Sequence, residues 1–443
     1  MKTKLPKILR FTALLILLIL ILNAVADPLI SVSSIDYNLI AGFYEEPEET
    51  LDAVYIGSSN CFVFWNSLFA WEEYGICVYP YASSSQPFYA TQYLIKECRK
   101  TQPDAVYIVN INTMVNDVIA YKDMHWLLDY MPFSLNKLAM TDYLCDVGEL
   151  DLEDRLEYYF HIIRYHDRWE DLVPADFERA ELWRKGASLY NPYLSKQENI
   201  AQAYLTTPET TTLSEKLNAC VESLLDYCEK EDLQVLFVTV PQARESLEEV
   251  KMYNTFNQMA RERGFATLDL LHNAQALNLD LTQDFYNEEH TNIHGSLKFT
   301  HYLSRYLIEH FGLKDKRNDE SYSHWQKAFT RYYRTTSLYT LPFELDPHSR
   351  SYDLPSPDGL NAAANKGQVK VSWQDVARAD GYAIFRKAPG VAWTQITLTG
   401  ETSYTDTTCK AGTEYTYIVV PYITNEGQTL YGNFLTAGVK AKP

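Results

Sequence analysis

The chain has 443 residues, and its 39 Lys and Arg against 58 Asp and Glu give a formal charge of −19. This balance argues against nucleic acid as a partner, because phosphate recognition needs a concentrated basic surface. Hydrophobic residues make up 46% of the chain and aromatic residues 14%, which excludes global disorder and predicts two or three folded domains.

The first 26 residues predict export. A basic leader over residues 2–10 precedes an apolar run over 11–22. Counted over residues 8–26, the stretch is just long enough to span a bilayer as a helix, which indicates a signal-anchor. The ending Ala24-x-Ala26 is also typical of a cleavable signal peptide. In either case we expect the bulk of the chain to be extracytoplasmic, at the cell membrane through the N-terminal helix or secreted.

From residue 27 to about 335, short apolar runs alternate with amphipathic helical patterns. This alternation is typical of an α/β fold with a doubly wound parallel sheet covered by helices on both faces, an α/β/α sandwich. The expected strands are 51–56, 76–80, 105–109, 235–240 and 266–270, and the expected helices are 86–100, 213–230, 248–263 and 297–311.

The alternation stops between about residues 119 and 208, where Trp, Tyr, His and acidic residues are dense. We expect a largely helical insertion that serves as a lid or an interaction surface. Within it, Arg168 and Trp169 are candidate substrate-binding residues, because a guanidinium matches anionic groups and an indole face matches a sugar ring. A solvated helix with a buried Trp is the alternative interpretation.

Residues 336–354 read as a linker, and residues 355–443 read as short alternating strands. Trp373 in an early strand, the pair Gly381-Tyr382, and Tyr415-x-Tyr417 late in the segment resemble a fibronectin type III module. The resemblance implies an all-β, immunoglobulin-like sandwich with these aromatic residues in its core. A spacer or adhesion role is the expected one.

Seven cysteines are scattered without a CxxC or Cys/His pattern, so no zinc or other metal site is predicted, and no cofactor either. Cys77, Cys220 and Cys228 lie in apolar patterns and are expected to be buried thiols. Because the number is odd, at least one thiol is free or pairs between chains.

Two short motifs carry candidate chemistry. Gly57-Ser58-Ser59-Asn60 follows the first expected strand, and His290 lies just before the last expected helix. In an open parallel sheet, ligands bind beyond the carboxyl ends of the strands. A serine hydroxyl there is a nucleophile once a histidine takes its proton, so Ser59 and His290 are candidates for nucleophile and base. The alternative is that the serines only cap a helix.

These blocks resemble the SGNH (GDSL-like) hydrolase family over about residues 50–312. Gly57-Ser58-Ser59 stands where that family has Gly-Asp-Ser, and His290-x-Asn-x-x-Gly resembles its last block. The resemblance implies Ser59 as the nucleophile and His290 as the base. It also implies three oxyanion donors: the N–H of Ser59, a small residue within 82–85 for which we take Ser84, and Asn110 or Asn112.

One position departs from the family pattern. The family usually has Asp three residues before the histidine, where this chain has Asn287. An amide oxygen can hold an imidazole but cannot stabilise an imidazolium by charge. Asp284, Glu288 and Glu289 are nearby substitutes, of which we choose Asp284; a Ser-His dyad and a site that has lost catalysis stay open.

The resemblance is strongest to the exported, membrane-anchored branch of the family, which includes D-alanyl-lipoteichoic acid transfer proteins and acetyltransferase-like proteins of exopolysaccharide assembly. It implies a serine esterase or O-acyltransferase acting on acyl groups of a cell-surface polysaccharide or cell-wall polymer, with a membrane acyl-donor protein as a partner. The alternatives are an inactive scaffold or carbohydrate-binding protein of the same fold, and a lipase or peptidase.

Overall fold

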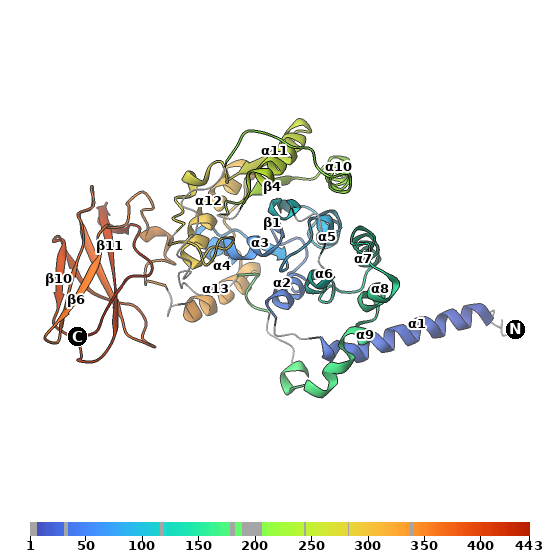
Figure 1. The fold of residues 1–443 in the computed structure, drawn as a ribbon, viewed down its shortest axis with the longest axis horizontal. Helices are drawn as coiled ribbons and strands as arrows, with labels where there is room; N and C mark the ends of the chain where they lie inside the picture. Colours follow the sequence, from blue (N-terminus) through green and yellow to red (C-terminus); the bar gives the residue numbers. More distant parts are fainter. Residues whose placement is uncertain are drawn as a thin grey trace.

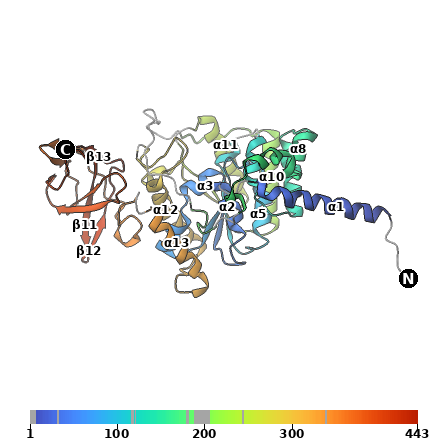
Figure 2. The same cartoon turned by 90° about the horizontal axis from the view of Figure 1, so that it is seen from below.

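The molecule is elongated, with the N-terminal helix at one end and the β-sandwich at the other (Figures 1 and 2). The computed structural model describes residues 7–30, 34–115, 119, 121–177, 182–187, 206–242, 245–281, 283–336 and 340–443.

A parallel sheet of five strands forms the centre of the larger domain, as expected from the sequence. Its strand order is β2-β1-β3-β4-β5. The strands are β1 (Ala53–Gly57), β2 (Val78–Ala82), β3 (Val106–Asn110), β4 (Val235–Thr239) and β5 (Ala266–Asp269). Strands β1 to β4 are buried throughout, which explains why they read as continuous apolar runs.

Alternate residues of these strands enter two cores on opposite faces of the sheet. Val54 and Val109 belong to the core on one face, whereas Tyr55 and Ile108 belong to the core on the other. The helices of this domain are α2 (Ile35–Phe43), α3 (Ser59–Phe64), α4 (Ser67–Tyr74), α5 (Thr91–Cys98), α10 (Glu215–Lys230), α11 (Leu247–Glu262), α12 (Ile293–Phe311) and α13 (Ser323–Thr336). The fold is therefore doubly wound.

The described part of the expected insertion is helical. It contains α6 (Tyr121–Leu128), α7 (Leu135–Val147), α8 (Leu152–Tyr159) and α9 (His161–Tyr165). Helix α9 packs beside α1 (Lys7–Ala26), as Figure 1 shows. A search of the described residues finds no helix with both the length and the apolar character needed to cross a membrane.

Short 3₁₀ turns connect these elements. They are η1 (Asp27–Leu29), η2 (Phe88–Ala90), η3 (Asn112–Val115), η4 (His166–Asp171), η5 (Pro174–Phe177), η6 (Ala274–Leu277), η7 (Glu320–Tyr322) and η8 (Pro347–Ser349).

The C-terminal domain is an antiparallel sandwich of two sheets. One sheet has the order β10-β7-β6 and the other β12-β11-β8-β9, with β13 paired to β11. The strands are β6 (Asn361–Asn365), β7 (Gln368–Ser372), β8 (Gly381–Lys387), β9 (Thr394–Thr399), β10 (Ser403–Asp406), β11 (Tyr415–Asn425), β12 (Gln428–Tyr431) and β13 (Val439–Ala441). Trp373, Tyr382 and Tyr417 are buried between the sheets, which is the core role expected for them.

The described part of the segment expected as a linker, residues 340–354, is packed between the two domains. Leu341 and Phe343 join a core with Phe385 and Phe434 of the sandwich, whereas Leu345 joins the core of the α/β domain. Alternating apolar residues let one short segment contribute to both cores. The sandwich is therefore docked on the α/β domain and is not held on a free tether.

All seven cysteines are free thiols, and all but Cys409 are buried. Burial raises the pKa of Cys145 and of Cys220 to about 11, and that of Cys228 to about 12. Such thiols stay protonated at neutral pH and behave as small apolar side chains.

Candidate active site

The candidate site lies where the strand order changes direction. Strands β2 and β3 lie on opposite sides of β1, so the connections that leave β1 and β3 diverge at their carboxyl ends. The parallel register pairs Ile56 with Val109, which places Gly57 beside Asn110. A Cβ added at Gly57 would lie 2.8 Å from the Cβ of Asn110 and 2.6 Å from the Sγ of Cys61. Only glycine allows this close approach.

Ser59 and His290 meet directly at this edge, although 231 positions separate them in the chain. The Oγ of Ser59 lies 2.8 Å from the Nε2 of His290. Ser59 is the first residue of α3, so its own N–H has no acceptor within the helix. Ser58 is the N-cap residue, yet its side chain makes no capping hydrogen bond. Helix capping therefore does not account for the serine pair.

Asn287 holds the backbone of the histidine loop. Its Oδ1 accepts hydrogen bonds of 2.9 Å from the N–H of Glu289 and of 2.9 Å from the N–H of His290. The N–H of Tyr286 donates to the carbonyl of His290 at 2.7 Å, which closes the loop. Asn287 therefore orients His290 through its main chain, and its amide oxygen is not aimed at the imidazole.

The structure does not bring Asp284 to the imidazole. Its buried carboxylate accepts hydrogen bonds from the Lys298 Nζ at 2.7 Å and from the Asp280 N–H at 2.8 Å. Lys298 belongs to α12, and its ammonium group neutralises the Asp284 carboxylate. We therefore correct the expectation that Asp284 orients the base. Asp284 instead joins the loop before His290 to α12, through the Asp280 N–H and Lys298.

Of the two candidate oxyanion amides, Asn110 is the one beside the serine turn. Its Oδ1 accepts from the Asn112 N–H at 3.0 Å, and its Nδ2 lies 3.5 Å from the hydroxyl of Tyr55, a long contact. Asn112 is committed elsewhere: its Nδ2 donates to the carbonyl of Val240 at 2.9 Å, and its Oδ1 accepts from the Val240 N–H at 2.9 Å. Asn112 thus ties β3 to the end of β4.

Ser84 is held by a carboxylate. Its N–H donates to Asp36 Oδ1 at 2.6 Å, and its Oγ donates to Asp36 Oδ2 at 3.3 Å. Burial raises the pKa of Asp36, although these hydrogen bonds partly offset the rise. Because its N–H is engaged, we withdraw Ser84 as the donor from this loop. Ser83 is fully buried and precedes it directly after β2.

Gln242 is a residue of this site that sequence reasoning missed. Its Nε2 donates to the Oδ1 of Asn60 at 3.0 Å and to the carbonyl of Glu289 at 3.3 Å. Gln242 therefore links the neighbour of the candidate nucleophile to the neighbour of the candidate base. The available signal was its position, since Val240-Pro241-Gln242 follows the fourth strand at the same edge of the sheet.

Further hydrogen bonds fasten the histidine loop and α12 to α3. Thr291 Oγ1 donates to the carbonyl of Val63 at 2.9 Å, and Ser296 Oγ donates to the carbonyl of Phe64 at 3.0 Å. Asn292 caps α12 by accepting from the N–H of His294 at 3.0 Å. Ser59 and His290 thus lie on elements that are joined to each other by hydrogen bonds.

Arg168 and Trp169 lie on η4, in the part of the insertion next to α9 and η1. The guanidinium of Arg168 donates to the carbonyl of Leu29 at 2.6 Å and also pairs with Asp176. Arg168 therefore fastens the base of the N-terminal helix and is occupied by protein groups. Trp169 is 64% exposed, which corrects the alternative of a buried Trp.

Within the described residues, no group of three or more His, Cys, Asp and Glu side chains could hold a metal ion. His294, four residues after His290, is bound through Nδ1 to Glu344 at 2.5 Å. Its ring is thus engaged with the segment that joins the domains.

No family model matches the chain, and no curated protein does so either. Solved structures match over about a fifth of it. An Fn3-like protein from Clostridium thermocellum is 24% identical and covers 20% of this chain and 94% of its own, with a TM-score of 0.17. An FN3 domain of human collagen XX is 22% identical and covers 19% and 91%, with a TM-score of 0.16. The strand order itself shows a parallel five-stranded α/β domain followed by an antiparallel β-sandwich of two sheets.

Proposed function

We propose that the chain is an exported serine esterase or O-acyltransferase that acts on acyl groups of a cell-surface polysaccharide or cell-wall polymer. The observation that carries the proposal is the 2.8 Å contact between Ser59 Oγ and His290 Nε2 at the carboxyl edge of the sheet. A hydroxyl within hydrogen-bond reach of an imidazole is the minimal arrangement for an activated serine.

The reaction begins with proton transfer. With the ring proton on Nδ1, His290 Nε2 accepts the hydroxyl proton of Ser59 while Oγ attacks the carbonyl carbon of the acyl ester. The tetrahedral intermediate then collapses, and the sugar oxygen leaves with the proton held by His290. The acyl group remains on Ser59 as an ester.

The negative charge of the intermediate needs donors at the same edge. The N–H of Ser59 and the amide of Asn110 are the two groups that we assign to this role. Gln242 and Asn287 are positioning residues. Gln242 binds Asn60, the neighbour of Ser59, and Asn287 accepts from the main-chain N–H of His290.

The second half of the reaction decides between the two activities. If water attacks the acyl-serine with His290 as base, the chain is an esterase. If a sugar hydroxyl attacks, the chain is an O-acyltransferase; a membrane acyl-donor protein then supplies the acyl group in the first half, and the donor's own heteroatom leaves with the proton in place of the sugar oxygen. Both versions keep the expectation that residues 1–26 direct the chain out of the cytoplasm.

Activity on p-nitrophenyl acetate and on acetylated xylan tests the proposal. Ser59→Ala should lower kcat/KM by about 10³-fold or more, since the nucleophile is lost. Ser58→Ala is the matched control, because Ser58 is adjacent and makes no side-chain capping bond. Equal activity of wild type and Ser59→Ala would contradict the proposal.

An inactive scaffold or carbohydrate-binding protein of the same fold is the second candidate. Two placements favour it: Asp284 is neutralised by Lys298, and Asn287 binds the loop backbone. Under this alternative, folded wild-type protein hydrolyses neither ester.

A further inference from the structure

A hollow lies along the outer face of α12, and neither Ser59 nor His290 is among the residues that line it. Its volume is about 750 Å³, which is within the range of roughly 300–1,000 Å³ typical of ligand pockets. It is also lined by residues of the η6 turn and by Tyr352 and Asp353 at the entry to the sandwich. We call this hollow the α12 cleft.

The floor of the α12 cleft carries unusual residues for a solvent-facing helix stripe. The buried stripe of α12 contains Phe299, Leu303 and Leu307. The outward stripe that lines the cleft includes, at helical spacing, Tyr302, Arg305, Tyr306, Glu309 and His310. The ring centroids of Tyr306 and His310 lie 4.1 Å apart. Tyr302 and Tyr306 are half-buried against the core that contains this buried stripe, and both also line the cleft.

The charges in the cleft indicate a neutral ligand. Arg305 and Glu309 are both exposed, and neither takes part in an ion pair with any residue that the structure describes. Asp353 adds a second carboxylate, and the other lining cation, Lys298, is paired with Asp284 at 2.7 Å, so Arg305 alone does not make the cleft an anion site. Half-buried tyrosine rings with their hydroxyl groups, beside amide, basic and acidic side chains, suit a polyhydroxylated, uncharged chain.

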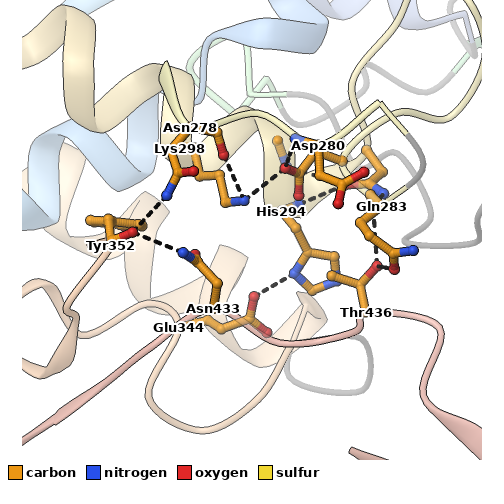
Figure 3. A network of polar contacts seen from close by, with 12 residues as sticks. Asn278, Asp280, Gln283, His294, Lys298, Glu344, Tyr352, Asn433 and Thr436 are labelled. Atoms are coloured by element: carbon orange, nitrogen blue, oxygen red, sulfur yellow. Dashed lines mark hydrogen bonds and ion pairs between the residues drawn. The ribbon is translucent and has the colours of Figure 1, made fainter. Parts of the chain in front are cut away.

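The sandwich-side wall is fixed by a network that joins both domains (Figure 3). The carbonyl of Tyr352 accepts from Asn278 Nδ2 at 2.6 Å and from Asn433 Nδ2 at 2.8 Å. Lys298 Nζ donates to the carbonyl of Asn278 at 3.0 Å and to Asp284 at 2.7 Å. The wall is therefore formed before any ligand binds, and it reaches the loop that carries His290.

We propose that the α12 cleft binds a segment of a neutral oligosaccharide chain. The inference rests on the proposed function and deepens it by naming the polymer as neutral. Arg305 lies twelve residues beyond the first residue of α12, roughly 18 Å along the helix. One extended polymer can thus occupy the cleft and present an acylated unit to Ser59, which a single sugar cannot do.

Binding to the full chain carrying Ser59→Ala tests the inference, because this variant turns over no ester. The probes are cellohexaose, xylohexaose, hexa-N-acetylchitohexaose and, as an acidic comparison, hexagalacturonate, measured by isothermal titration calorimetry. At least one neutral hexasaccharide should bind. Tyr306→Ala and Arg305→Ala, each checked for folding by circular dichroism, should weaken that binding by about tenfold. Tyr333→Ala, which removes an exposed tyrosine of α13, should leave it unchanged.

Three results would overturn the inference: no neutral hexasaccharide binds at millimolar concentration, hexagalacturonate binds more tightly, or Arg305→Ala and a folded Tyr306→Ala both bind as well as their parent. These results are separate from the test of the proposed function. A chain without esterase activity can still bind glycan in the cleft, and an active esterase can fail to do so.

Discussion

Two backbone N–H groups next to the candidate base, those of Glu289 and His290, donate to the same amide oxygen of Asn287. An aspartate at this position would keep the acceptor, so Asn287→Asp should retain kcat/KM close to that of wild type. Asn287→Ala loses both hydrogen bonds, worth about 1 kcal/mol each, and should lower kcat/KM by about tenfold or more. Steady-state kinetics on p-nitrophenyl acetate checks this; an Asn287→Ala variant as active as wild type would show that the loop needs no such support.

The neighbouring amides Asn110 and Asn112 should separate catalysis from stability. Asn110→Ala removes the proposed oxyanion donor and should lower kcat by about 10²-fold or more. Asn112→Ala leaves both backbone groups of Val240 without their partner and should lower the free energy of unfolding by about 1–3 kcal/mol. Urea unfolding and kinetics on the same samples measure both. A loss of kcat confined to Asn112→Ala would reverse the two roles.

The sequence predicted the two residues that meet but not their supporting partners. Ser59 and His290 follow from their positions after a strand and before a helix. Which way Asp284 or Ser84 turns depends on loop geometry, and no periodic pattern encodes it. Asp284 turns to Lys298 of the next helix, and Ser84 binds Asp36, forty-eight positions earlier in the chain.

At the scale of elements, the insertion contains a buried histidine that makes stability depend on pH. His161 of α9 lies 3.5 Å from Asp129, and burial lowers its pKa below the ordinary value of 6.5. The unfolded chain therefore takes up this proton at a higher pH than the native chain does. Stability should accordingly fall as the pH drops through and below 6.5.

Asp129 titrates in a lower window. Burial alone would raise its pKa, but the hydrogen bond and charge of His125 hold it below 3.8. Its contribution is lost only as the pH falls below that value. We therefore assign to His161 the loss of stability that begins near neutral pH. His161→Gln should show a smaller fall in Tm between neutral pH and about pH 5 than wild type does. His348→Gln, which changes an exposed histidine, should show the same fall as wild type. Equal falls in Tm for wild type and His161→Gln would contradict this assignment.

The strands and most helices of the sheet domain could be predicted because their apolar periodicity is strong. The predicted strand at 235–240 matches β4, and the predicted helix at 248–263 matches α11 to within a residue. Helix α12 begins four residues before the predicted 297, because Asn292 caps it. The strand order could not be predicted, since periodicity carries no information on which strands lie side by side.

For the whole molecule, the packed junction predicts that the two domains unfold together. Phe343 is 5% exposed and contacts the rings of Phe385, Tyr431 and Phe434. Phe343→Ala should cost about 3–5 kcal/mol at this junction and uncouple the sandwich. Differential scanning calorimetry should show one transition for wild type and two for the variant. Two separate transitions in wild type would mean that the junction does not couple the domains.

The apolar residues of this junction were visible in the sequence. Leu341, Phe343 and Leu345 alternate within 336–354, but the loop-like residues that follow them, Arg350-Ser351 and Pro355-Ser-Pro357, favoured the interpretation as a linker. Two folded neighbours on either side are needed to bury such a short segment. Its packing is therefore a property of the whole chain and not of the local pattern.

Labelling with a fluorophosphonate probe tests the central claim most directly, because the probe reacts far faster with an activated serine than with an ordinary serine hydroxyl. The full chain should be labelled, and mass spectrometry should place the label on the peptide that contains Ser59. Ser59→Ala should abolish labelling, and His290→Ala should strongly reduce it. A folded wild-type chain that stays unlabelled, or carries the label on another residue, would contradict the account of Ser59 and His290 as a catalytic pair.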